Sequence, residues 1–227
     1  MSQQHVSITC GSIFLEGILH EPEVTGRVPG VVVCHPHPAY GGNMTNIIVV
    51  KVCQAMVQKG FVALRFNFRG AGRSDGHFDA GVGEREDVRA AISFLEQQPT
   101  VLPAKLGLLG YSFGATVGIR VAAHDPRVKA FVGISLPSLS GTGSGVPIPS
   151  HFEDDAVVTC TIPRLFIVGE HDEFAPLASF YADIAQLQPP VQIEVIPGAT
   201  HFWTARAAEA ADKAAQFLAE TLLAPMA

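Results

Sequence analysis

Apolar residues follow two different patterns that alternate along this chain. One pattern predicts strands and the other predicts helices. Short runs that are almost wholly apolar are typical of strands buried on both faces of a parallel sheet. Such strands are predicted at residues 30–34, 61–66, 106–110, 129–134 and 163–169. Between them, apolar residues recur at the spacing of a helix with one buried face. These helices are predicted at residues 46–59, 84–98, about 112–124, 176–187 and 204–223.

Three other segments complete the predicted architecture. Residues 5–20 alternate apolar and polar positions around a Gly-Ser turn, which indicates a hairpin, and residues 191–196 indicate a last strand. Residues 135–161 are rich in Gly, Ser and Pro and predict a loop with one short helix near 152–156. Strands that alternate with helices predict an α/β fold, with a mostly parallel central sheet and helices on both faces. No linker or repeat interrupts this order, so residues 1–227 are expected to form a single domain.

Composition narrows the class of protein without changing this fold. The 227 residues are 48% hydrophobic and 16% charged, which is typical of a globular protein. The net charge of −6 offers no basic patch, so we expect no nucleic-acid partner. No apolar run approaches the ~20 residues of a membrane helix, and the first residues do not form a signal peptide. We therefore expect a cytoplasmic protein with no membrane partner, whose four cysteines are reduced.

A Gly-x-Ser-x-Gly motif at residues 110–114 lies between an apolar strand and a helix of small residues. A serine at this position is held on a sharp turn, with its hydroxyl exposed at the carboxyl end of the sheet. A side chain at Gly110 or Gly114 would block the close approach of strand and helix that the turn requires. We interpret Ser112 as a nucleophile. The alternative is a surface turn that matches the motif by chance, since the chain has 22 glycines.

A serine hydroxyl needs a base within hydrogen-bond reach, and histidine is the usual one. Of the nine histidines, His201 is the best placed, because it follows the last predicted strand at a carboxyl end of the sheet. A histidine in a surface loop is the alternative interpretation. His171 could compete as the base, but that assignment would leave the neighbouring Asp172 without a role.

A carboxylate is needed to orient the base, and the segment after the strand at 163–169 offers three. Asp172 is the best candidate, while Glu170 and Glu173 are interpreted as solvated or turn residues. The order Ser112, Asp172, His201 along the chain is the order that accompanies the Gly-x-Ser-x-Gly turn. Agreement among three separate positions is stronger evidence than any one of them.

An oxyanion hole requires two donors aimed at the developing negative charge. The backbone N–H of Phe113, at the start of a helix, is predicted to supply one. The second is expected from the loop at 35–42, where His37 has a proline on each side and proline has no N–H. His37 is therefore the predicted second donor, with Ala39 or Tyr40 as alternatives.

Aromatic residues near these positions are candidates for substrate contacts, with core packing as the alternative. Tyr40, Phe174 and Trp203 are predicted to bind the substrate. Phe152 and Phe202 are further candidates for an acyl pocket.

At nearly its full length the chain resembles serine hydrolases of the α/β-hydrolase fold, and within them the small carboxylesterases and dienelactone-hydrolase-like proteins. The motifs that carry the resemblance are His-Pro-His-Pro at 35–38, Asn-Phe-Arg-Gly-Ala-Gly-Arg-Ser at 67–74, Gly-Tyr-Ser-Phe-Gly at 110–114, Gly-Glu-His-Asp at 169–172 and Gly-Ala-Thr-His at 198–201. The resemblance implies a triad of Ser112, Asp172 and His201, with an oxyanion hole at the amides of His37 and Phe113. Many relatives insert a helical cap after the sixth strand, whereas 135–161 is short here, so a minimal cap or none is expected.

The predicted function is hydrolysis of carboxylic esters of small or short-chain acyl groups through an acyl-enzyme, with no cofactor and no metal. Thioesters, lactones and small peptides remain alternatives on the same triad, and the oligomeric state stays open. A different interpretation makes His35 and His37 metal ligands, completed by His201 and Asp172. Gly-x-Gly at 70–72 resembles part of a nucleotide loop but is interpreted as a turn over the active site. A binding protein without catalysis is the last alternative.

Overall fold

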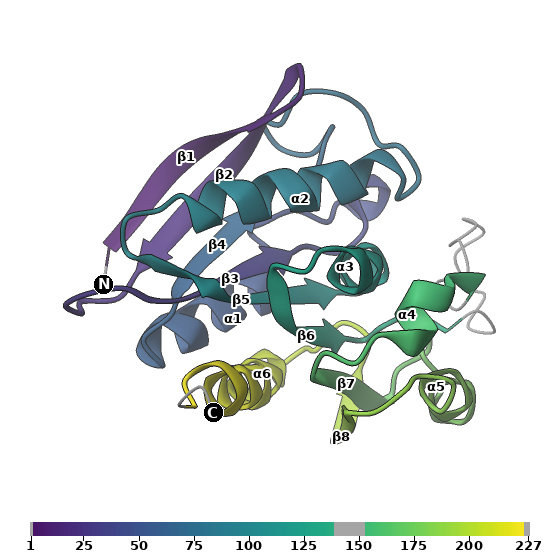
Figure 1. Ribbon diagram of the computed structural model, residues 1–227. Coiled ribbons are helices and arrows are strands. Elements are labelled where there is room, and N and C mark those ends of the chain that lie inside the picture. Colours follow the sequence, from purple (N-terminus) through teal and green to yellow (C-terminus); the bar gives the residue numbers. More distant parts are fainter. Residues whose placement is uncertain (1, 139–152, 225–227) are drawn as a thin grey trace.

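The computed structural model describes residues 2–138 and 153–224, which are built around one eight-stranded sheet (Figure 1). The strands are β1 (Ser2–Cys10), β2 (Ile13–Glu21), β3 (Val28–Cys34), β4 (Val62–Phe66), β5 (Val101–Tyr111), β6 (Val128–Ile134), β7 (Arg164–His171) and β8 (Val191–Thr200). Their order across the sheet is β1-β2-β4-β3-β5-β6-β7-β8. β1 and β2 form the predicted antiparallel hairpin, β2 is antiparallel to β4, and all other neighbours are parallel. The predicted α/β fold with a mostly parallel sheet is confirmed.

Helices cover both faces of the sheet, as Figure 1 shows. They are α1 (Ile47–Gln58), α2 (Gly83–Glu96), α3 (Phe113–His124), α4 (Asp155–Thr159), α5 (Leu177–Ile184) and α6 (Ala207–Leu222). The side chains of α1 and α6 form one hydrophobic cluster with one face of the sheet, while α2, α3, α4 and α5 contribute to a second cluster on the other face. Because both faces are covered, the central strands are buried on both sides, as their continuous apolar runs predict.

The last two strands run further than the sequence pattern predicts. β8 continues to Thr200, and β7 continues to His171. The two strands pair from their start to the pair His171–Thr200, across a register shift. A Cβ at Gly169 would lie 2.4 Å from the carbonyl oxygen of Ala199, so a glycine is needed where the strands come together. The extended pairing places Asp172 and His201 directly after adjacent strand ends.

The loop between β6 and β7 is described only in part. Residues 135–138 and 153–161 contain one short helix, α4, slightly later than the helix predicted near 152–156. Phe152, a candidate for the acyl pocket, lies outside the described residues. Within the described part of this loop there is no helical cap, in agreement with the expectation of a minimal one. None of the helices in the described ranges has both the length and the apolar character needed to cross a membrane.

Candidate active site

The turn between β5 and α3 holds Ser112 in a conformation that ordinary residues rarely adopt, with φ 54° and ψ −119°. The N–H of Ser112 donates to the carbonyl of Ile134 at 2.9 Å, which fixes the turn to β6. A Cβ at Gly110 would lie 2.2 Å from the carbonyl oxygen of Gly114, and one at Gly114 would lie 2.5 Å from that of Cys34. The predicted steric need for both glycines is therefore confirmed.

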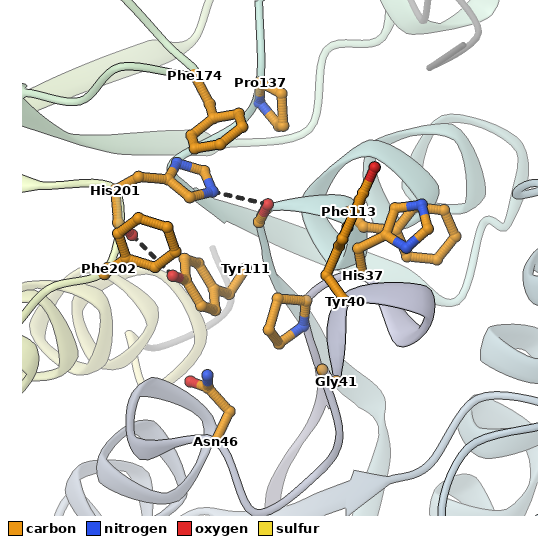
Figure 2. Close-up of a pocket in the computed structure, with 13 residues that line it drawn as sticks. His37, Tyr40, Gly41, Asn46, Tyr111, Phe113, Pro137, Phe174, His201 and Phe202 are labelled. Atoms are coloured by element: carbon orange, nitrogen blue, oxygen red, sulfur yellow. Dashed lines mark hydrogen bonds between the residues drawn. The ribbon is translucent and has the colours of Figure 1, made fainter. Parts of the chain in front are cut away.

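The structure brings Ser112, His201 and Asp172 together in one hydrogen-bonded chain. Ser112 Oγ lies 2.9 Å from His201 Nε2, a contact drawn as a dashed line from His201 in Figure 2. His201 Nδ1 lies 2.8 Å from Asp172 Oδ1. All three side chains are largely buried. A carboxylate beside Nδ1 keeps the proton on that nitrogen, so Nε2 presents its lone pair and accepts the hydroxyl proton of the serine. The arrangement is chemically competent for activating a serine nucleophile.

The loop after β7 orients Asp172. Its Oδ1 accepts the backbone N–H groups of Phe174 and Ala175, both at 3.0 Å. The same oxygen faces His201 Nδ1, so the carboxylate is fixed by its own loop before it contacts the imidazole. The ring of Phe174 packs against that of His201 with centres 4.5 Å apart. A rigid carboxylate and a tilted aromatic ring in contact with the imidazole together restrict its rotation.

Two neighbouring glutamates fix the loop after β8. Glu170 Oε2 accepts the N–H of Gly198 at 2.9 Å, and Glu173 Oε2 accepts the N–H of His201 at 3.3 Å. The hydroxyl of Tyr111 donates to the carbonyl of His201 at 2.7 Å. The interpretation of these glutamates as merely solvated or turn residues is therefore incomplete, because both hold the backbone that carries the histidine.

The amides predicted for the oxyanion hole lie at the starts of two helical turns. Phe113 is the first residue of α3, and His37 precedes the 3₁₀ turn η1 (Pro38–Tyr40). Among the residues that the structure describes, neither N–H has an acceptor. The two alternative donors are engaged, since the N–H of Ala39 donates to His37 Nδ1 at 3.2 Å and that of Tyr40 donates to the His37 carbonyl at 3.1 Å. This pattern leaves His37 and Phe113 as available donors.

His35 is held in place as a structural residue. Its Nε2 accepts the N–H of Phe68 at 3.0 Å, so the proton lies on Nδ1, which donates to the carbonyl of Pro36 at 2.6 Å. Burial lowers the pKa of His35 to about 4 and keeps the ring neutral. Both ring nitrogens are thus occupied. Across residues 2–138 and 153–224, no three His, Cys, Asp or Glu side chains gather closely enough to hold a metal ion, so the metal-dependent alternative lacks its ligand set there.

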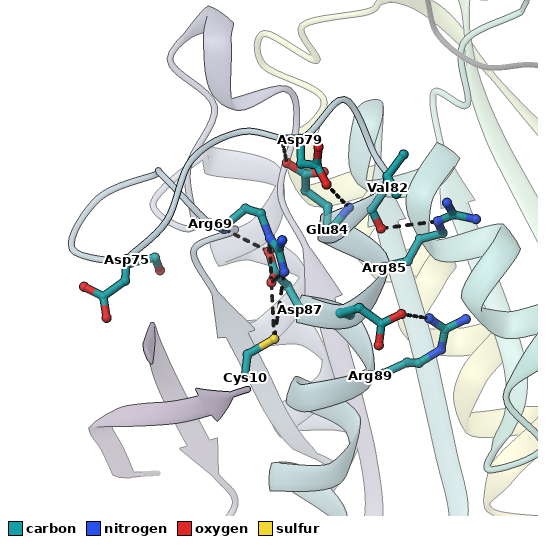
Figure 3. Close-up of polar contacts among 12 residues, drawn as sticks. Cys10, Arg69, Asp75, Asp79, Val82, Glu84, Arg85, Asp87 and Arg89 are labelled. Carbon is teal, nitrogen blue, oxygen red and sulfur yellow. Dashed lines mark hydrogen bonds and ion pairs between the residues drawn. The ribbon is translucent and has the colours of Figure 1, made fainter. Parts of the chain in front are cut away.

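The loop after β4 stabilises the site through residues that lie outside the pocket lining. Asp87 of α2 accepts the backbone N–H of Arg69 at 2.9 Å and its guanidinium Nη2 at 2.7 Å (Figure 3). Phe68 in the same loop contacts His35, as described above. No residue of 67–76 lines the pocket at Ser112, so the interpretation of this segment as a turn over the active site is wrong.

Comparison with known proteins agrees with this geometry. The sequence profile of the dienelactone hydrolase family matches residues 15–223. The chain belongs to the dienelactone hydrolase family. An uncharacterized protein of Rickettsia prowazekii is 32% identical to this family member, over 78% of this chain and 73% of its own length. A Bradyrhizobium protein described as a probable 2-oxo-3-(5-oxofuran-2-ylidene)propanoate lactonase is 30% identical, over 81% and 76% of the two chains.

Solved structures place this dienelactone hydrolase family member among serine hydrolases. An alpha-beta serine hydrolase homologue from Coxiella burnetii is 29% identical, with a TM-score of 0.82 and 98% of each chain covered. A serine hydrolase without lid from Xanthomonas campestris is 27% identical, with a TM-score of 0.80, covering 100% of this chain and 98% of that one. The family and the structural neighbours together show that this protein belongs to the hydrolases and has the α/β-hydrolase fold.

In this family member the pocket beside Ser112 has a volume of about 420 Å³. It is lined by Pro36, His37, Tyr40, Gly41, Gly42, Asn46, Tyr111, Ser112, Phe113, Pro137, Phe174, His201 and Phe202 (Figure 2). Tyr40 and Phe174, two of the three predicted substrate contacts, are among them. Trp203 is not: its side chain is fully buried, and its indole N–H donates to Ser135 Oγ at 2.9 Å. The prediction for Trp203 is therefore wrong, and its exposed neighbour Phe202 faces the pocket instead.

Asn46 and Tyr111 are lining residues that the sequence reasoning missed. Asn46 carries the N-terminal cap of α1, and its position in the sequence signals only where that helix begins. Tyr111 precedes the serine inside the Gly-x-Ser-x-Gly motif at 110–114, and no role of its own is predicted for it. For Tyr111 the motif itself held a signal, because the residue before the nucleophile lies at the same carboxyl end of the sheet.

Proposed function

We propose that this protein hydrolyses carboxylic esters of small or short-chain acyl groups through an acyl-enzyme on Ser112. The proposal rests on one observation above all: the hydrogen-bonded chain from Ser112 through His201 to Asp172. The family supplies the broader class, a hydrolase, and the geometry supplies the candidate residues.

In the proposed mechanism, Ser112 Oγ attacks the carbonyl carbon while its proton passes to His201 Nε2. The carbonyl oxygen takes up the negative charge and accepts hydrogen bonds from the amides of His37 and Phe113. His201 then gives the proton to the leaving alcohol oxygen, the carbon–oxygen bond breaks, and the acyl group stays on Ser112. A water molecule, deprotonated by His201, then attacks the acyl carbon. The bond from that carbon to Ser112 Oγ breaks, His201 returns the proton to Oγ, and the acid is released.

Asp172 contributes through His201, as a positioning residue. Its charge stabilises the imidazolium that forms in each step, and its hydrogen bond fixes the tautomer. The carboxylate is buried and already bound by two backbone amides, so little reorganisation is needed when charge develops on the ring.

Lactone hydrolysis is the second candidate function. The Bradyrhizobium relative is described as a probable lactonase, and the family is named for dienelactone hydrolysis. A lactone is a cyclic ester, so the same steps would open it, with the leaving alcohol still attached to the acyl group. Ester and lactone substrates therefore need the same three side chains.

The first test is hydrolysis of p-nitrophenyl acetate by Ser112→Ala. We expect kcat to fall at least 10³-fold, on the order of what removal of a serine nucleophile causes, while the circular dichroism spectrum stays unchanged. Ser179→Ala, on the exposed side of α5, is the matched control and should retain full activity. Retention of more than a tenth of the activity by Ser112→Ala would refute the assignment.

A further inference from the structure

The described lining of the pocket lacks the charged side chains Lys, Arg, Asp and Glu. The titratable groups there are two histidines and two tyrosines. In the sequence, residues 139–152 contain no Lys, Arg, Asp or Glu either. A carboxylate on a substrate would therefore enter this pocket without a cationic partner.

Two carboxylates, those of Asp172 and Glu173, lie close enough to the pocket lining to act on Tyr111. Burial, together with the carboxylates of Asp172 and Glu173, raises the pKa of Tyr111, whose ring lines the pocket. The same carboxylates would repel an anionic substrate, and the largely apolar walls would screen that repulsion less than water does. An uncharged substrate needs no cationic partner and is not repelled by these carboxylates.

One side-chain amide faces this apolar space. Asn46 Oδ1 accepts the N–H of Ile48 at 3.0 Å, which fixes the orientation of the carboxamide. In the described part of the chain, Asn46 Nδ2 makes no hydrogen bond of its own. Figure 2 shows Asn46 on the opposite side of the pocket from Phe174 and Pro137. Its two N–H groups are therefore available to an acceptor on the substrate.

The proposed reaction fixes which part of the substrate lies near Asn46. His201 Nε2 must reach the leaving oxygen to protonate it, so the leaving group lies on the side of His201 and Phe174. The acyl group then lies in the part of the pocket away from Phe174, where Figure 2 shows Asn46.

We propose that this pocket selects uncharged acyl groups that carry a hydrogen-bond acceptor, which Asn46 Nδ2 recognises, and that it discriminates against acyl groups with a free carboxylate. The inference rests on the proposed ester hydrolysis and names its substrate class. The proposed preference for uncharged acyl groups distinguishes the substrates of this protein from the one named for its Bradyrhizobium relative, a propanoate.

The test compares three matched sets of p-nitrophenyl esters: the monomethyl esters of succinate, glutarate and adipate, the corresponding half-acids, and alkyl chains of equal length. Acyl chains of three lengths are compared so that one of them brings its acceptor within hydrogen-bond distance of Asn46 Nδ2. We expect kcat/KM for the best methyl ester to exceed that of its half-acid at least about tenfold at neutral pH. Raising the salt concentration should reduce this ratio of kcat/KM values. Salt screens electrostatic repulsion but does not change how the acyl group fits the pocket.

The role of Asn46 is tested with Asn46→Ser, which retains a side-chain acceptor for the helix cap but shortens the donor. The methyl ester should be preferred to the alkyl ester about fivefold by the wild type, and this preference should disappear in the variant. Asn43→Ser is the matched control: Asn43 Oδ1 caps the N–H of Thr45 in the same loop, but Asn43 does not line the pocket. This control should keep the preference.

The outcomes distinguish the inference from the function on which it rests. Equal kcat/KM for half-acids and methyl esters would overturn the selectivity while leaving the ester hydrolase intact. An unchanged methyl-ester preference in Asn46→Ser would overturn the role of Asn46. No turnover of any ester, with no labelling of Ser112 by an organophosphonate, would overturn the proposed function and this inference with it.

Discussion

At the scale of single residues, backbone strain at Ser112 is what aims its hydroxyl at His201. A non-glycine residue at this φ and ψ costs about 1–3 kcal/mol. The cost is offset locally by the hydrogen bond from its N–H to Ile134 and by the packing that the two flanking glycines allow. The strained position is thus part of what makes the serine available to a base.

His35 shows how a residue near the site contributes through its neutral form. Its ring joins the loop at 35–37 to Phe68, and protonation would break the bond that Nε2 accepts. The neutral state is therefore a structural requirement.

We predict that this requirement makes stability depend on pH. The pKa of His35 is about 4 in the folded chain and about 6.5 when unfolded, so between these values the unfolded state binds the extra proton. The free energy of unfolding should therefore fall as the pH drops from about 6.5 toward 4, by up to about 3 kcal/mol from this residue. Urea denaturation at a series of pH values measures it.

His35→Gln should make this dependence less steep, since glutamine does not titrate. The buried His20, whose pKa is also lowered to about 4, keeps part of it. His5→Gln on the exposed edge of β1 should leave it unchanged. An equally steep dependence in His35→Gln would contradict the account.

Residue-scale prediction from sequence worked where a motif fixes local chemistry and failed where burial depends on distant partners. The placement of Ser112 on a turn follows from its two glycines. Trp203 is predicted from the sequence to contact the substrate, with core packing as the alternative, and its buried side chain bonded to Ser135 shows that the alternative is correct. Nothing local to Trp203 in the sequence indicates that partner.

At the scale of elements, the loop after β4 is joined to α2 by one buried charge. The side chain of Asp87 is fully buried and binds both the backbone and the guanidinium of Arg69 (Figure 3). Through Phe68 and His35 this connection reaches the loop that carries His37. The α2 helix therefore supports the site without contributing a residue to the pocket lining.

Asp87→Asn should lower the free energy of unfolding by about 3 kcal/mol, because it leaves the guanidinium of Arg69 partly buried without its anion. The adjacent Glu86→Gln is the control. Glu86 pairs with Arg89 on the solvent side of the same helix, and its loss should change stability by no more than about 0.5 kcal/mol. Similar losses in the two variants, measured by urea denaturation, would contradict this role of Asp87.

The ends of elements were harder to predict than their existence. Pro197 and Gly198 are typical turn residues, so the sequence predicts that the last strand stops at Ile196. The strand continues because its pairing with β7 resumes after the register shift and ends at His171–Thr200. Strand pairing is a long-range property, and it outweighs local turn preference here.

At the scale of the whole molecule, topology assembles the site. The turn at Ser112 and the loops that carry His37, Asp172 and His201 all follow parallel strands, so they meet at one edge of the sheet. This convergence was predictable once the alternation of strands and helices was recognised. The residues that line the pocket were harder to predict, because they depend on which loop side chains point into it.

The open architecture predicts a preference for short acyl chains. The pocket holds about 420 Å³, and the described residues place no helical cap over it to bury a long chain. With p-nitrophenyl esters of graded length, kcat/KM should be highest at about two to six carbons and fall beyond them. A maximum at twelve carbons or more would contradict the open-site interpretation.

The most direct test of the central claim is covalent labelling followed by mass spectrometry. An organophosphonate that reacts only with an activated serine should add a single adduct, and peptide mapping should place it on Ser112. The rate of labelling should fall by orders of magnitude in His201→Ala, which lacks the base. An adduct on another residue, or none at all on the folded protein, would contradict the account.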